Sequence, residues 1–157
     1  EGRCPWTRGT RGGGEVMGDS VFFVDDDPAI LGALRRLLLD EPYEVRTSSD
    51  PVAALGAIRA QPPTVIVADY YMPPMNGPAF LLETRRIAPS AVRMILTGKP
   101  DLGAVVTAVQ DGGVHRFLIK PWDDDDLRMT IRNAFDYYRL VSERDSLLAE
   151  INRRATR

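Results

Sequence analysis

The stretch Thr64-Val65-Ile66-Val67-Ala68-Asp69 is the strongest strand signal in the chain. Its apolar run is uninterrupted and rich in β-branched residues, which is typical of a strand covered on both faces. Pro62 and Pro63 precede it, and a segment rich in turn residues follows Asp69. This stretch therefore predicts the central strand of a parallel sheet, with Asp69 at its carboxyl end.

Apolar runs and amphipathic stretches alternate on both sides of this strand. Further strands are predicted at 21–24, 43–47, 93–96 and 117–119. Helices are predicted to begin after Asp26 or Asp27, at Asp50-Pro51, at about Pro78, after Asp101 and at about Asp124. Five strands that are each followed by a helix indicate an α/β fold, a doubly wound five-stranded parallel sheet with helices on both faces.

The composition favours one compact domain with a tail at either end. The 157 residues are 44% hydrophobic and 27% charged. We expect a disordered N-terminal segment over residues 1–19, a globular domain over 20–138, and a helical extension or linker over 139–157. The net charge of -2 gives no overall electrostatic drive toward nucleic acid, although it leaves a local basic face open, and we expect no direct nucleic-acid partner. No apolar run is long enough for a membrane span. Cys4 is the only cysteine, which excludes an internal disulfide and favours a cytoplasmic protein.

Polar side chains follow four of the predicted strands, where functional groups gather in such sheets. Asp25 and Asp26 follow the first strand and Asp69 the third, whereas Thr97 and Lys120 follow the last two. Three converging carboxylates repel one another, and a hard cation such as Mg²⁺ would neutralise them. Lys120 and Thr97 add an ammonium and a hydroxyl that can bind the oxygens of a phosphoryl group held at Asp69. A carboxylate attacks phosphorus without needing a base, so Asp69 is the predicted nucleophile.

Four sequence blocks resemble those of response-regulator receiver domains. They are Val-Asp-Asp-Asp at 24–27, Asp-Tyr-Tyr-Met-Pro-Pro-Met-Asn-Gly at 69–77, Leu-Thr-Gly at 96–98 and Lys-Pro-Trp at 120–122. The resemblance covers about residues 20–138, and four blocks in the right order make it specific. It implies the flavodoxin-like receiver fold of the CheY-like superfamily, and it is the ground for expecting a cis peptide bond before Pro121.

The resemblance also implies a role for individual residues. These are Asp25 and Asp26 as the metal-binding pair, Asp69 as phospho-acceptor and metal ligand, Tyr71 as a metal ligand through its carbonyl, Thr97 and Phe117 as switch residues, and Lys120 as the phosphate-binding lysine. Mg²⁺ is the implied cofactor, a histidine kinase the phosphoryl donor, and an output module or partner the reader of helix four, strand five and helix five. Such a switch is not a turnover enzyme. Phe117 lacks the hydroxyl of the receivers that carry tyrosine there, and an ordinary core role for it is the alternative.

Two other functions stay open at this point. One is a Mg²⁺-dependent phosphatase or phosphotransferase, which the absence of a second acid two residues after Asp69 disfavours. The other is an interaction module that keeps the fold without the chemistry, which the intact site residues disfavour.

The C-terminal segment has a heptad-like apolar pattern. Its members are Ala134, Val141, Leu148 and Ala155, seven residues apart, with Tyr137, Leu140, Leu147 and Ile151 beside them. The pattern is typical of a two-stranded coiled coil in a homodimer or of a signalling helix, although Arg144 interrupts it. A long surface helix is the alternative.

Overall fold

A computed structural model describes residues 19–98, 103, 106, 109–110 and 113–156. Its central feature is a five-stranded parallel sheet in the order β2-β1-β3-β6-β7. The strands are β1 (Ser20–Val24), β2 (Glu44–Ser48), β3 (Val65–Asp69), β6 (Val92–Thr97) and β7 (Arg116–Ile119). The predicted central strand is confirmed, because β3 pairs with β1 on one side and with β6 on the other.

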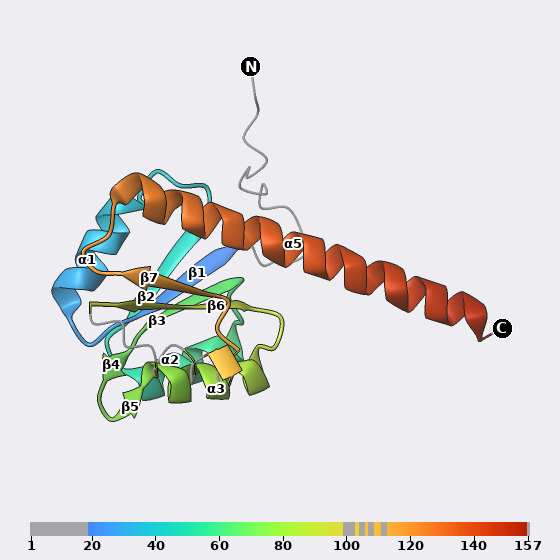
Figure 1. Cartoon of the computed structure of the whole chain (residues 1–157), viewed down its shortest axis with the longest axis horizontal. Helices are drawn as coiled ribbons and strands as arrows, with labels where there is room; N and C mark the ends of the chain where they lie inside the picture. Colours follow the sequence, from blue (N-terminus) through green and yellow to red (C-terminus); the bar gives the residue numbers. More distant parts are fainter. Residues whose placement is uncertain (1–18, 99–102, 104–105, 107–108, 111–112, 157) are drawn as a thin grey trace, which may run out of the picture.

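Helices cover both faces of this sheet (Figure 1). On one face lie α1 (Pro28–Leu37) and α5 (Asp124–Ala155), and on the other α2 (Pro51–Ala60) and α3 (Gly77–Ile87). Successive strand residues point to opposite faces, so Val65 and Val67 join the α1/α5 core whereas Ile66 and Ala68 join the α2/α3 core. The doubly wound architecture expected from the sequence is confirmed.

Short polar side chains set the starts of the helices. Asp27 caps α1 by accepting a hydrogen bond from the Ala29 amide at 2.9 Å, and Asp50 caps α2 through the Val52 amide at 2.9 Å. A proline occupies the first turn of each of these helices, where a missing N–H costs nothing. Of the two predicted caps for α1, Asp27 is the one used, which leaves Asp26 free for the sheet edge.

The segment after Asp69, which is rich in turn residues, contains a small hairpin that its sequence did not predict. Strands β4 (Tyr71–Met72) and β5 (Met75–Asn76) pair antiparallel around Pro73-Pro74, whose peptide bond is cis. Proline suppresses a strand prediction, because its ring removes a ladder donor, and here the two prolines form the turn itself. The Lys120-Pro121 bond is cis as expected.

The last helix continues well past the domain (Figure 1). Helix α5 has 32 residues, and those buried in the core all fall between Leu127 and Phe135. No helix among the described residues is long and apolar enough to cross a membrane. The predicted disordered segment, except Asp19, and most of the helix predicted after Asp101 lie outside the described residues.

Candidate functional site

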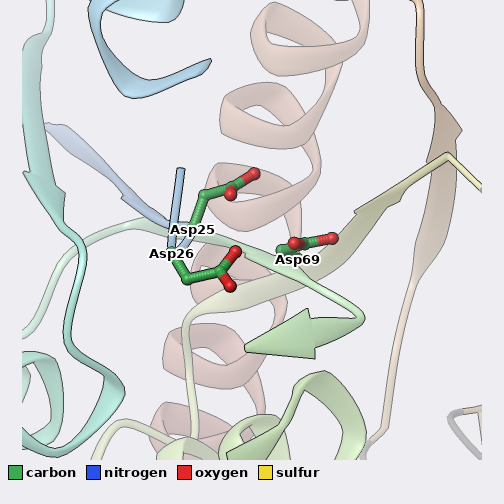
Figure 2. A group of neighbouring side chains, drawn as sticks. All are labelled: Asp25, Asp26 and Asp69. Atoms are coloured by element: carbon green, nitrogen blue, oxygen red, sulfur yellow. The ribbon is translucent and has the colours of Figure 1, made fainter. Parts of the chain in front are cut away.

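The carboxyl edge of the sheet brings three aspartates together (Figure 2). Asp25 and Asp26 follow β1, and Asp69 ends the neighbouring strand β3. Each aspartate contributes one carboxylate oxygen to a group of three that all lie within 4.8 Å of one another. Asp25 is 3% exposed, whereas Asp26 is open to solvent, so the cluster has a buried floor and an accessible rim. Residues that are 44 positions apart in sequence therefore form one acidic pocket.

Lys120 places its ammonium between two of these carboxylates. Its Nζ donates a hydrogen bond to Asp25 Oδ2 at 2.7 Å and lies 3.4 Å from Asp69 Oδ1. Strand β7 delivers it there, since the Lys120 amide donates to the Thr97 carbonyl and extends the ladder by one residue. The ammonium thus offsets part of the negative charge of the pocket.

The site shifts the pKa values of its own groups. Burial raises the pKa of Asp69 above its ordinary value, and the Asp25 charge raises it further, while Lys120 opposes both. Burial alone would lower the pKa of Lys120, but its hydrogen bond to Asp25 and the charges of Asp25 and Asp69 outweigh burial, so its pKa is raised. The pocket therefore holds more negative charge than one lysine neutralises.

The oxygen set fits a hard divalent cation. Mg²⁺ prefers carboxylate oxygens and retains several waters, and Asp25, Asp26 and Asp69 offer such oxygens around an accessible rim. Burial is the larger cause of the raised pKa of Asp69, and a cation there would offset the second cause, which is the charge of Asp25. The three aspartates predicted from sequence do lie together, and their oxygens are of the kind that a Mg²⁺ site uses.

The other predicted residues lie around this pocket. Thr97 ends β6 and is 2% exposed, next to Leu96, the residue that pairs with Asp69. Phe117 lies on the edge strand β7, partly buried against the α2/α3 core. Tyr71 begins β4 two residues after Asp69, and its side chain is 58% exposed. Their assigned roles as switch residues and carbonyl ligand stay predictions.

Gly77 was not among the predicted site residues, yet it lies against the backbone of Asp69. Its amide donates to the Tyr70 carbonyl at 2.8 Å, which folds the hairpin back against the end of β3. A Cβ atom at this position would lie 2.5 Å from the Asp69 carbonyl oxygen and 3.1 Å from the Tyr70 Cα. The Asn76-Gly77 turn signal was visible in the sequence, but this close backbone approach appears only when the chain is folded.

Comparison with known proteins agrees with this geometry. The family model described as "Response regulator receiver domain" matches residues 21–132. The hydrogenase transcriptional regulatory protein HoxA of Cupriavidus necator is 34% identical over 132 residues, which are 84% of this chain and 27% of that protein. The chain thus spans about a quarter of the length of this curated relative.

Solved structures give the same result. A crystal structure described as adenylate cyclase from Rhodopirellula baltica has a TM-score of 0.77 and 36% identity, covering 83% of this chain and 97% of that one. The beryllofluoride-activated NtrC4 receiver domain dimer has a TM-score of 0.71 and 30% identity, covering 76% of this chain and 98% of that one. Fold, acidic pocket and family model coincide on the same residues, and the chain belongs to the response regulator receiver domains of two-component signalling, a family of switches and not of turnover enzymes.

Proposed function

We propose that this protein is a phosphorylation-controlled switch in which Asp69 accepts a phosphoryl group from the phosphohistidine of a histidine kinase. The observation that carries the proposal is the convergence of Asp25, Asp26 and Asp69 with the Lys120 ammonium at one edge of the sheet. Receiver domains as a family act with histidine kinases, which supplies the class of donor.

In the transfer step, an Asp69 carboxylate oxygen forms a bond to phosphorus while the phosphorus–nitrogen bond of the phosphohistidine breaks. The bonding electrons stay on the imidazole, which takes up a proton, and Asp69 becomes an acyl phosphate. Mg²⁺, held by Asp25, Asp26, Asp69 and the Tyr71 carbonyl, would neutralise charge on the phosphoryl oxygens. Lys120 is already within 3.4 Å of Asp69, so its ammonium can bind a phosphoryl oxygen without a large movement.

The proposed output of the switch is the surface that strand β7 and helix α5 form with the helix predicted after Asp101, most of which lies outside the described residues. A new charge at Asp69 draws the Thr97 hydroxyl toward it, and Phe117 on the neighbouring strand repacks. A groove of about 260 Å³ runs along β7 and the start of α5, and its lining includes Phe117, Ile119 and Trp122. Repacking of Phe117 therefore changes the shape of a surface that a partner can read.

The relatives suggest what the switch controls. HoxA is described as a transcriptional regulatory protein, and this chain matches about a quarter of it. We propose that an output module or partner of that kind reads the switch, that the protein acts in the cytoplasm, and that a second copy of the chain is a further partner, since the NtrC4 receiver is described as a dimer. Residues 20–138 are the proposed receiver unit and residues 139–157 its helical extension.

The test is the intact mass of the protein after incubation with acetyl phosphate, with and without Mg²⁺. We expect a gain of roughly 80 Da, labile to hydroxylamine, that requires both Mg²⁺ and Asp69. The matched control is Asp27→Asn, because Asp27 caps α1 next to the pocket and asparagine caps equally well. Asp69→Asn should abolish the gain and Asp27→Asn should keep it.

Two results would contradict the proposal. No adduct and no beryllofluoride binding would favour the interaction module that keeps only the fold. Sustained release of phosphate from an external phosphoester, lost in Asp69→Asn, would favour a phosphatase instead.

A further inference from the structure

The part of α5 beyond the domain carries an apolar stripe whose large side chains face solvent. It consists of Tyr137, Leu140, Val141, Leu147, Leu148 and Ile151, and five of these are 48–66% exposed, Val141 being partly buried. These positions fall within an arc of about 120° on a helix of 3.6 residues per turn. The ion pairs of the described residues after Arg139 are made within the helix itself. This part of α5 extends away from the sheet (Figure 1).

We propose that this stripe, from Tyr137 to Ile151, pairs with the same stripe of a second copy of this chain in a parallel, in-register coiled coil. This pairing rests on the proposal that a second copy of the chain is a partner, and it specifies the surface that the two copies use. It does not depend on phosphoryl transfer at Asp69. Both can therefore be tested separately.

The spacing of the stripe favours a helix as its occupant. Val141 and Leu148 are seven residues apart. Tyr137, Arg144 and Ile151 form a second series with the same interval, in which Arg144 comes three residues after Val141 and Ile151 three residues after Leu148. This is the a/d pattern that places side chains into the spaces of a facing helix over several turns. A two-fold pair satisfies it with identical surfaces, the commonest arrangement in soluble oligomers.

The area available is enough for a dimer. Six side chains that each lose about 100 Å² to the partner give about 1,200 Å² over both helices, the lower end of specific interfaces. The stripe also begins at Tyr137, whose ring lies 5.4 Å from the His115 ring beside β7. The proposed contact between the two helices therefore begins where α5 still packs against its own domain.

Arg144 decides between the parallel and antiparallel orientations. In a parallel pair both Arg144 side chains fall in one layer, beside Asp145 of the second copy, which can replace the contact of 3.3 Å that Arg144 makes with its own Asp145. In an antiparallel pair of the same heptad each Arg144 would face Val141 of the other copy, which disrupts two layers. The parallel pair loses less apolar contact and keeps an acid beside each guanidinium.

The test uses the whole chain, without phosphoryl donor or beryllofluoride, in a Cys4→Ser background that removes the only native thiol. Leu148→Cys places a thiol in the proposed seam, and Ser146→Cys places one on the opposite side of the same helix. Mild oxidation should link Leu148→Cys chains into a disulfide dimer and leave Ser146→Cys chains largely unlinked. In an antiparallel pair the two thiols at 148 would stand about 16 Å apart, too far to join.

Association without crosslinking is measured by sedimentation. We expect a dimer at chain concentrations of about 100 µM, weakened at least about 30-fold by Leu148→Asp and little changed by Ser146→Asp. Arg144→Leu, which removes the charge from the seam, should strengthen the dimer by about tenfold. A monomer at every concentration would overturn the proposal, and a dimer that does not crosslink through Leu148→Cys would overturn its parallel geometry.

Discussion

Replacing Gly77 with alanine should damage the site by moving the Asp69 backbone, without touching any charged group. The added Cβ would lie 2.5 Å from the Asp69 carbonyl oxygen, a distance that real Cβ atoms do not adopt. Since the obstructing atoms are backbone, a side-chain rotation cannot relieve the contact, and the end of β3 or the start of α3 must shift.

The size of the effect follows from that contact. Forcing one methyl group into a closely packed position costs about 1–3 kcal/mol of the free energy of unfolding. Displacement of Asp69 by even a few tenths of an ångström also disturbs the approach to phosphorus, and we expect phosphorylation to slow by about tenfold to a hundredfold. The measurements are urea unfolding and the rate of mass gain from acetyl phosphate.

The control is the same substitution at Gly56. This glycine lies inside α2 with nothing within 4 Å of the added Cβ. Alanine favours the helix there, so Gly56→Ala should stabilise the protein by about 0.5–1 kcal/mol and leave the phosphorylation rate unchanged. If Gly77→Ala were as stable and as reactive as Gly56→Ala, the close approach of Gly77 to Asp69 would have no functional importance and the reasoning would be wrong.

Three further predictions concern the charges of the pocket. Lys120→Met should lower the free energy of unfolding near pH 7 by about 3 kcal/mol in a urea titration, because it leaves the buried Asp25 without its partner at 2.7 Å. The control is Arg128→Met, which loses only a surface pair with Asp125. It should change the free energy of unfolding by under about 0.5 kcal/mol in the same titration. Mg²⁺ at a hundred times its Kd should raise the free energy of unfolding by about 2.7 kcal/mol, measured as a rise in Tm. Asp26→Asn should lose this rise, whereas Asp27→Asn should retain it. Equal rises in both variants would place the ion elsewhere. Folding raises the pKa of Asp69, so the folded state keeps the proton of this carboxyl group to higher pH than the unfolded state does. Without metal, ionisation of Asp69 therefore lowers the free energy of unfolding as the pH rises from about 4 through that raised pKa. Asp69→Asn should therefore be more stable than wild type at pH 7 and equal to it near pH 3 in metal-free urea titrations, and a variant less stable at pH 7 would reverse the sign of this argument.

Local sequence patterns were sufficient for the five strands of the parallel sheet and for most helix starts. The β-branched run of β3 was identified because a strand buried on both faces must be apolar at consecutive positions. Asp27-Pro28 and Asp50-Pro51 marked the starts of α1 and α2, since capping and the first helical turn depend only on neighbouring residues. The positions of Asp25, Asp69 and Lys120 at the ends of the first, third and fifth strands of the sheet were enough to predict the pocket, because parallel strands end at one edge.

Other features were decided only by tertiary structure. The hairpin β4–β5 is formed around two prolines that argue against strands locally, and it is held by the Gly77 amide donating to the Tyr70 carbonyl. The Lys120 ammonium lies closer to Asp25 than to Asp69, a difference that the packing of distant strands sets and that no local pattern encodes. The parallel strands and the chemistry of the pocket follow from periodicity and residue type, which are local properties of the sequence. Only the folded chain decided distances, pKa shifts and the close contact at Gly77, because these depend on residues far apart in sequence that packing brings together.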